Sequence, residues 1–245
     1  MTSAAVKQQV LELGGAFMIS REARVFGKAT GVAGFHGAYT RGRGGVLGDV
    51  DADVVTAAFG FFEPAGVRAA WESVRMPAAD AAEGYMLACR DFGQRKLAAF
   101  EHADRLAELL RRVVDAAPCT GVPLFAGWRA MPVPANGRAA VLQLTHVLRE
   151  LRGGLHLIAV MANGLTPLQA ILVAGSPIYD GPGHAKFLGW AEPFETVTDD
   201  VRVRWEAAEK LTDELIAPCF EVLDESERDE LAALMLQAHR VALSR

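Results

Sequence analysis

Three residues suited to acid–base chemistry lie within five positions of one another: His146, Arg149 and Glu150. They are three and four positions apart, so one face of the helix expected at 138–152 presents all three. A histidine titrates near neutral pH and can move a proton, while an arginine can hold an anionic substrate. We predict catalytic roles for His146 and Glu150, and substrate binding by Arg149. The alternative is a solvated helix face on which Glu150 is an ordinary salt-bridge partner.

Two further residues continue this pattern along the chain. Arg152 stands at the end of the same expected helix, and His156 lies in the apolar segment 155–163 that follows. We predict that Arg152 helps to hold an anion and that His156 is catalytic. The alternative for His156 is a core histidine with one satisfied hydrogen bond, which is the usual state of a single histidine on an apolar face.

A second cluster of polar residues lies in the glycine-rich segment 34–43, which contains His36, Tyr39 and Arg43. Glycines let the backbone approach a ligand closely, and arginine binds a carboxylate or phosphate through two parallel hydrogen bonds. We predict an anion-binding loop in which Arg43 contacts substrate and His36 is catalytic. The alternative is a mobile surface loop. The segment lacks the lysine arrangement of a nucleotide-binding P-loop.

Two weaker candidates complete the set. Trp128 and Arg129 are adjacent, so we predict that they form a cation–π pair or a pocket wall that contacts substrate, although core packing also explains a tryptophan. The turn at 179–184 carries Asp180 and His184, an acid and a base that could belong to a site or a lid. Turn chemistry alone also accounts for its Asp, Gly and Pro residues.

Metal and cofactor chemistry are not indicated. The histidines and cysteines show neither an HExxH motif nor paired spacing, so we predict no metal site. There is no GxSxG nucleophile motif and no dinucleotide-binding glycine fingerprint, so we predict no cofactor. The three cysteines are widely spaced and odd in number, which favours a reducing compartment.

The composition is that of a folded protein, because 51% of the 245 residues are apolar. The formal net charge of −5 gives no general attraction to phosphate backbones. No apolar run approaches the roughly 20 residues that span a bilayer, and the N-terminus has no signal-peptide pattern. We therefore predict a cytoplasmic protein that does not associate with membranes.

The periodicity predicts a mainly α fold. Residues 118–137, rich in proline and glycine, are the expected linker between an N-terminal half at 1–117 and a C-terminal half at 138–245. Each half contains a helix-turn-helix-like passage, at 51–72 and at 155–173. The loop-like segment 175–193 could hold a degenerate wing. We thus predict two winged-helix-like halves, the second closed by helices at 198–215 and 225–243.

Three passages carry a family resemblance: 42–64, 123–132 and 148–167. They resemble a largely uncharacterised actinobacterial family with a domain related to helix-turn-helix proteins. Residues 189–190 and 198–218 are similar to the tail of that family, which is itself similar to the closing helices of MarR-like regulators. Members of the family often have a His where Leu151 stands and an Asp where Gly154 stands. The resemblance implies a degenerate winged-helix fold and specifies no chemistry.

The charge distribution argues against a DNA-binding regulator. Regulators read the major groove with a recognition helix and hold phosphates with Lys and Arg. No Lys or Arg occurs in the range 44–67, which covers most of the first candidate helix pair, or in 153–185, which covers the second. The second helix of the later pair, at 167–173, is apolar on nearly every side, which predicts burial. We expect no nucleic-acid binding.

These observations favour a small-metabolite-binding protein of specialised metabolism with an apolar pocket between the halves. A catalytic version would be a cofactor-independent enzyme that performs an elimination, an intramolecular displacement or cyclisation, or an isomerisation. One alternative is a ligand-responsive transcriptional regulator. Another is a non-catalytic partner subunit of a biosynthetic complex, and a homo- or hetero-oligomer fits either case.

Overall fold

The protein is helical throughout the part that the computed structural model describes, residues 2–244, where no strand occurs. The mainly α prediction is confirmed. The α-helices are α1 (Thr2–Ala16), α2 (Arg21–Ala29), α3 (Phe35–Gly44), α4 (Ala52–Phe59), α5 (Pro64–Ser73), α6 (Ala78–Lys96), α7 (Ala103–Ala116), α8 (Pro123–Ala130), α9 (Gly137–Ala162), α10 (Pro167–Ala174), α11 (Gly181–Phe187), α12 (Asp199–Ile216) and α13 (Glu225–Leu243), and the short 3-10 helices are η1 (Phe17–Ile19), η2 (Gly45–Leu47) and η3 (Ala217–Val222).

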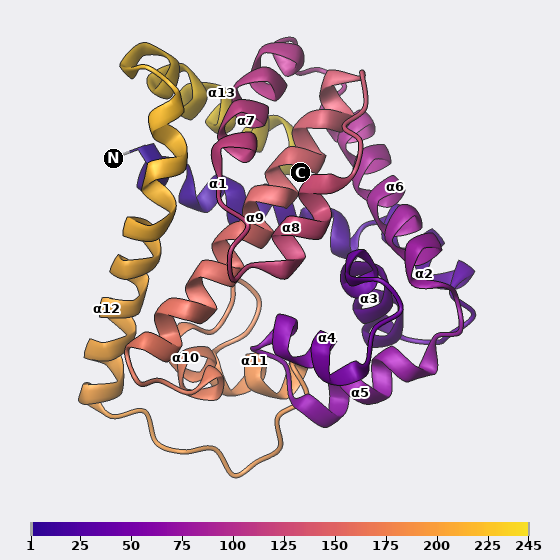
Figure 1. Ribbon diagram of the computed structural model, residues 1–245, viewed down its shortest axis with the longest axis vertical. Coiled ribbons are helices and arrows are strands. Elements are labelled where there is room, and N and C mark those ends of the chain that lie inside the picture. The colour runs from indigo at the N-terminus through magenta and orange to yellow at the C-terminus, as the bar shows by residue number, and fades with distance from the viewer. Residues whose placement is uncertain (1, 245) are drawn as a thin grey trace.

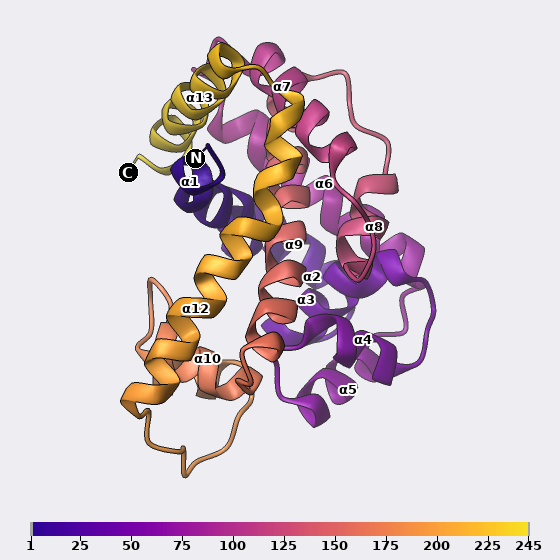
Figure 2. The same ribbon diagram turned by 60° about the vertical axis from the view of Figure 1, so that its left-hand side comes forward.

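The 26-residue helix α9 runs through the centre of the molecule (Figures 1 and 2). Helices α1, α6, α7, α8 and α12 all pack against it. Its buried residues occur on almost every side, including an uninterrupted run from Ala139 to Leu148. A helix that is buried all round belongs in the core of a protein. Polar side chains on α9 therefore meet other helices, and few of them meet solvent.

The two separate helices expected at 138–152 and 155–163 are in fact one helix, so that boundary was wrong. Gly153 and Gly154 lie inside it, and close packing accounts for Gly154. A Cβ atom at Gly154 would lie 2.7 Å from Cγ1 of Val122, just before α8, whereas one at Gly153 would meet nothing within 4 Å. Glycine inside a helix costs about 1 kcal/mol, which the surrounding packing tolerates here.

The end of α9 and α10 form the helix-turn-helix-like corner that was predicted at 155–173. The turn passes through Gly164, whose φ is 67°, and the two helices meet at a bend of 111°. Thr166 caps α10 with a reciprocal capping box to Gln169, and Pro167 occupies the first turn. Ala170, Ile171 and Leu172 are buried. Its other residues are half-buried or exposed, so the burial predicted for nearly every side holds for only part of this helix.

The loop expected at 34–43 is wrong, since these residues form α3. Its glycines serve helix packing: a Cβ atom at Gly42 would lie 2.7 Å from the Tyr85 ring of α6. The arginines of α3 are buried as well. Arg41 pairs with Asp49 and lies 4.2 Å over the Trp71 ring, so it does not form part of a basic surface.

The two predicted halves share one core. Residues 118–137, predicted as a linker, contain α8, which buries Phe125 and Trp128 completely. One continuous apolar cluster extends from Val6 in α1 to Ala242 in α13. The predicted winged-helix halves are not confirmed: residues 2–244 lack the strands of a wing, and α11 lies within the segment where a wing was expected.

Local sequence signals set several helix ends. Asp51 caps α4 and Pro64 begins α5. The last helix runs from Glu225 to Leu243, the range predicted from the sequence, and is capped by Asp224. Helices α6 and α7 are separated by a break that follows Lys96.

A test of the described helices for membrane spans finds no single one that is both long and apolar enough to cross a bilayer. Only α9 and α10 taken together reach the required length and hydropathy, and they are bent sharply against each other.

Candidate functional site

Several predicted site residues converge where α3, α6, α8 and α9 meet. They are Arg43 from α3, Trp128 from α8, and His146, Arg149 and Glu150 from α9. A residue that the sequence did not single out, Tyr85 of α6, joins them. We name the set the α9 polar cluster; its members are Arg43, Tyr85, Trp128, His146, Arg149 and Glu150.

A buried ion pair forms one side of the α9 polar cluster. Nε and the terminal nitrogen Nη2 of Arg43 donate to the two carboxylate oxygens of Glu150 at 3.0 and 2.8 Å. Glu150 is 2% exposed and Arg43 is 9% exposed. The Arg43 guanidinium also lies 4.5 Å from the ring centre of Phe59. Such a bidentate pair between two helices fixes both side chains in one geometry.

The ion pair holds both groups in their charged forms. Burial by itself would raise the pKa of Glu150, but the charge of Arg43 and the hydrogen bonds from it lower that pKa to about 2. Burial would likewise lower the pKa of Arg43, and the Glu150 charge raises it above its ordinary value. Glu150 is therefore an anion at physiological pH and does not act as a proton donor.

His146 lies beside this pair as a neutral base. Its Nδ1 is 3.3 Å from the carbonyl oxygen of Gly14 in α1, and a carbonyl only accepts, so Nδ1 carries the proton. The lone pair of the ring is then on Nε2, which is buried and has no hydrogen-bond partner in the protein. Burial lowers the pKa of His146 to about 4. At neutral pH the imidazole is uncharged and able to accept a proton.

The rings of Tyr85 and Trp128 lie beside that of His146, and each carries an unpaired polar atom of its own. The Tyr85 hydroxyl and the Trp128 indole nitrogen Nε1 are both buried without a partner. The ring centres of Tyr85 and Trp128 lie 5.8 and 5.4 Å from that of His146, and 5.6 Å from each other. An unpaired buried polar group costs about 1–3 kcal/mol, so three from three helices in one place call for an explanation.

Arg149 closes the α9 polar cluster on the side of α1. Its terminal nitrogen Nη1 donates to Glu150 at 3.2 Å, while its Nε is buried and has no partner. The guanidinium covers Gly15, where an added Cβ atom would stand 3.2 Å from Nε. The Arg149 side chain is 27% exposed, whereas that of Glu150 is fully buried. Arg149 is thus the member of the cluster that reaches towards solvent.

Arg152 and His156 do not join the α9 polar cluster, because they face α12. Arg152 donates to Asp213 at 2.7 Å and to Glu209 at 3.2 Å. Nδ1 of His156 lies 3.0 Å from the Thr212 hydroxyl, which itself donates to a backbone carbonyl. Burial lowers the pKa of His156. These side chains form a network that ties α12 to α9, with no unpaired buried atom at Arg152, His156 or Thr212.

The remaining predicted site residues lie apart from the α9 polar cluster. His36 is exposed near the start of α3, 5.3 Å from the ring of Phe187. Arg129 donates to the carbonyl of Ala117 and lies nearest the Phe125 ring, so the expected cation–π pair with Trp128 is not formed. His184 contacts the carbonyl of Gly175 at 2.8 Å, and Asp180 caps α11.

Tyr85 is the member of the α9 polar cluster that sequence reasoning missed. It occupies the apolar stripe of α6, next to Met86 and near Cys89, and all three are buried. In the sequence it therefore resembles any core aromatic. The one available signal was its chemistry, since a buried tyrosine usually finds a partner for its hydroxyl.

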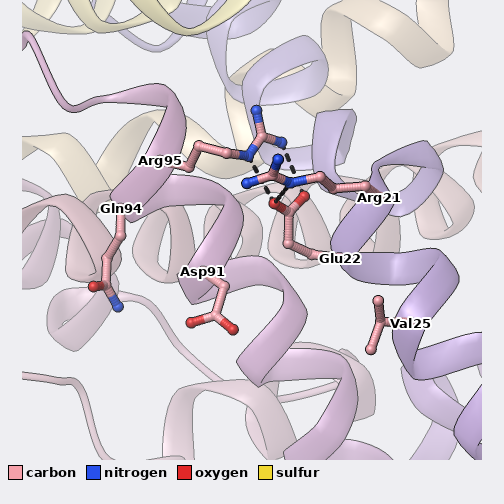
Figure 3. A pocket seen from close by; sticks show the side chains of 6 residues that line it. All are labelled: Arg21, Glu22, Val25, Asp91, Gln94 and Arg95. Carbon is pink, nitrogen blue, oxygen red and sulfur yellow. Dashed lines mark hydrogen bonds and ion pairs between the residues drawn. The ribbon is translucent and has the colours of Figure 1, made fainter.

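A surface pocket lies between α2 and α6 and is lined by Arg21, Glu22, Val25, Asp91, Gln94 and Arg95 (Figure 3). Figure 3 shows the Glu22 carboxylate beside the guanidinium groups of Arg21 and Arg95. Hydrogen bonds from Arg95 lower the Glu22 pKa well below its ordinary value. Arg21, Glu22 and Arg95 pair with one another, and no predicted site residue lines this pocket.

The described residues contain no group of three His, Cys, Asp or Glu side chains placed to hold a metal ion. Glu150, the one carboxylate of the α9 polar cluster, is occupied by two arginines. Cys89 lies fully buried in α6, and burial raises the pKa of its thiol well above the ordinary value.

Comparison with known protein families assigns this chain to a family. A family model described as a helix-turn-helix family matches residues 3–245. The chain belongs to this family. No curated protein and no solved structure matches it significantly.

Membership of a helix-turn-helix family directs attention to the two candidate helix pairs. In the pair α4–α5, Arg68 is engaged by Asp53 and Glu72. In the pair formed by the end of α9 and α10, the second helix has no charged residue and buries Ala170, Ile171 and Leu172. Both helix pairs therefore present few cationic groups of the kind that hold DNA phosphates.

Proposed function

We propose that this protein binds a small metabolite at the α9 polar cluster. The observation that carries this proposal is that three neighbouring rings from three different helices each hold a buried polar atom without a partner: the Tyr85 hydroxyl, the Trp128 indole nitrogen and Nε2 of His146. Buried polar groups in proteins are nearly always hydrogen-bonded, either within the protein or to a bound molecule. A polar ligand of a few atoms would satisfy all three.

The loss of stability caused by these unpaired polar atoms supports a functional role for them. Phenylalanine at position 85 would fill the same space and leave no hydroxyl unpaired, and an apolar ring at position 128 would do the same for the indole nitrogen. Each polar atom instead destabilises the fold by about 1–3 kcal/mol. Such local losses of stability are characteristic of binding and catalytic sites.

The geometry suits proton transfer without a cofactor. His146 would take a proton from the ligand through Nε2, because that nitrogen holds the free lone pair. The Trp128 N–H and the Tyr85 O–H would donate to negative charge that develops on the ligand. Glu150 does not touch the ligand in this scheme and instead holds Arg43 and Arg149 in place. Elimination, isomerisation and intramolecular displacement all need this combination of base and donors.

The test is native mass spectrometry of the protein purified from its own host. We expect the wild-type chain to retain a small molecule, and we expect Tyr85→Phe and Trp128→Phe to lose it. Trp205→Phe is the matched control, because its indole nitrogen is also buried and unpaired but belongs to α12, outside the cluster. A bare chain mass for the wild type, or equal retention by all variants, would refute the proposal. A stoichiometric second polypeptide would support the partner-subunit alternative instead.

Family membership favours one second candidate, a ligand-responsive regulator. A regulator would bind its own promoter with an affinity that falls steeply as salt rises, because released counterions drive such binding. Fluorescence anisotropy with promoter fragments at two salt concentrations tests it. Under our proposal no sequence-specific binding is expected, since both helix pairs present few free cationic side chains.

A further inference from the structure

The α9 polar cluster carries one positive charge that nothing in it balances. Arg43 and Arg149 both donate to Glu150, so two guanidinium groups share a single carboxylate. His146 is neutral at physiological pH because burial lowers its pKa. The Tyr85 hydroxyl is neutral too, since burial raises its pKa well above 10. The sum over the charged members is therefore +1.

The unbalanced positive charge can be assigned to Arg149. Arg149 uses Nη1 on Glu150, and its buried Nε is left unpaired. An arginine binds a carboxylate best through two parallel hydrogen bonds from neighbouring nitrogens. Nε of Arg149, which lies against Gly15 of α1, is thus an unused donor. Arg43 has no such donor at its Nε edge, because its own Nε and Nη2 already bind Glu150.

The neutral members His146 and Trp128 restrict which groups a ligand must carry. Nε2 of His146 can only accept a hydrogen bond, while the Trp128 N–H can only donate one. A ligand that satisfies both must carry a donor for His146 as well as acceptor oxygens for Arg149 and Trp128. A single inorganic anion without a proton meets only half of this requirement.

We infer that the ligand is a small monocarboxylate that carries an O–H or N–H group near its carboxylate. This inference rests on the proposed function. The carboxylate would bind the Nε edge of Arg149, and the O–H or N–H would donate to Nε2 of His146. A monoanion brings the net charge of the cluster to zero. A dianion such as a phosphate monoester would leave one buried negative charge in excess, which is costly.

Arg149 also has the right position for capture, since it is the member that reaches solvent. An arginine at the edge of a buried site attracts an anion and then loses its remaining contact with water as the anion binds. The same residue would set specificity, because a neutral ligand would leave its charge uncompensated.

Protein NMR tests this inference with defined probes. The indole N–H resonance of Trp128, assigned by its loss in Trp128→Phe, is followed during titration with glycolate, glycolamide and methylphosphonate. Glycolate has the carboxylate and the hydroxyl, glycolamide removes the charge, and methylphosphonate changes the shape and adds charge at high pH. We expect a saturable shift with glycolate and binding at least tenfold weaker with the other two.

Variants then assign the anion to Arg149. We expect Arg149→Gln to weaken glycolate binding at least tenfold and Arg149→Lys to weaken it less, because the lysine keeps the charge but not the two-nitrogen edge. Arg111→Gln, an exposed arginine of α7, is the control and should leave binding unchanged.

The outcomes separate the two proposals. If glycolamide binds as tightly as glycolate, or if Arg149→Gln binds glycolate normally, the ligand class is wrong although a ligand site exists. If no probe shifts the Trp128 resonance and native mass spectrometry finds a bare chain, both the site and the ligand class are refuted. A retained molecule whose mass and fragmentation identify a hydroxy or amino monocarboxylate would support both.

Discussion

Two sets of residues on α9 are of the same kinds but make different contacts. His146 and Arg149 stand beside Glu150 in the α9 polar cluster. Arg152 and His156, which follow in the same helix, meet Glu209 and Asp213 of α12. The network with α12 is complete: each buried nitrogen of Arg152 and His156 has a partner within the described chain. The α9 polar cluster is incomplete.

This difference shows what distinguishes a structural network from a candidate site. Both regions bury a histidine and an arginine, and in both cases burial lowers the histidine pKa. Residue type and pKa direction therefore do not separate them. The number of unpaired polar atoms does: of the eight buried side-chain atoms without a partner in the described residues, four belong to the α9 polar cluster and none to Arg152 or His156.

The largest expected effect comes from the ion pair of the α9 polar cluster. Glu150→Gln leaves Arg43 buried without its counter-charge, and we expect the free energy of unfolding in urea to fall by about 3–5 kcal/mol. Replacing both partners, as in Arg43→Met with Glu150→Met, should recover most of that loss because no buried charge is left behind. A double variant as unstable as the single one would contradict this account.

His146 should make the free energy of unfolding depend on pH by about 3 kcal/mol. Its pKa is about 4 in the folded state and about 6.5 when unfolded, so the unfolded state binds the proton first as the pH falls. Stability is therefore lost between pH 6.5 and pH 4. We expect His146→Gln to lose about 3 kcal/mol less than wild type over this range, measured by urea unfolding. Parallel curves for the two proteins would show that His146 does not contribute.

The network with α12 should respond more weakly and leave ligand retention unchanged. Arg152→Met removes the partner of Asp213 and Glu209, but those side chains are 29% and 21% exposed and can be hydrated. We expect a loss of about 1–2 kcal/mol in unfolding free energy. Native mass spectrometry of the same variant should still show the retained molecule. Loss of that molecule would show that the α12 network and the α9 polar cluster form one site.

The smallest effects should have opposite signs in the two regions. Tyr85→Phe removes an unpaired hydroxyl, and we expect the ligand-free protein to gain up to about 1 kcal/mol. Thr212→Val removes a hydroxyl that contacts both His156 and the carbonyl of Ala208, and we expect a loss of about 1 kcal/mol. Thermal unfolding of the two variants checks this. Destabilisation by Tyr85→Phe would mean that its hydroxyl has a partner in solution.

The sequence predicted the local features of this protein well. Caps at Asp51 and Thr166, the proline starts at Pro64 and Pro167, and the burial of part of α10 follow from residue pattern over one or two helical turns. It failed where glycine served packing between helices. The chain at 34–43 reads as a loop, yet Gly42 lies against Tyr85 of α6, a contact between residues 43 positions apart that no local pattern reveals.

The candidate site shows the same division. The spacing of His146, Arg149 and Glu150 placed these three side chains near one another on one helix, which needed only the 3.6-residue period. The partner of Glu150 is 107 positions away, and the unpaired atoms of Tyr85 and Trp128 come from two further helices. Only the packing of α3, α6 and α8 on α9 decided that this face carries an unbalanced charge, while Arg152 and His156 were paired with α12. Helical periodicity acts within a few residues, whereas charge balance and hydrogen-bond satisfaction are set by whatever the tertiary fold brings into contact.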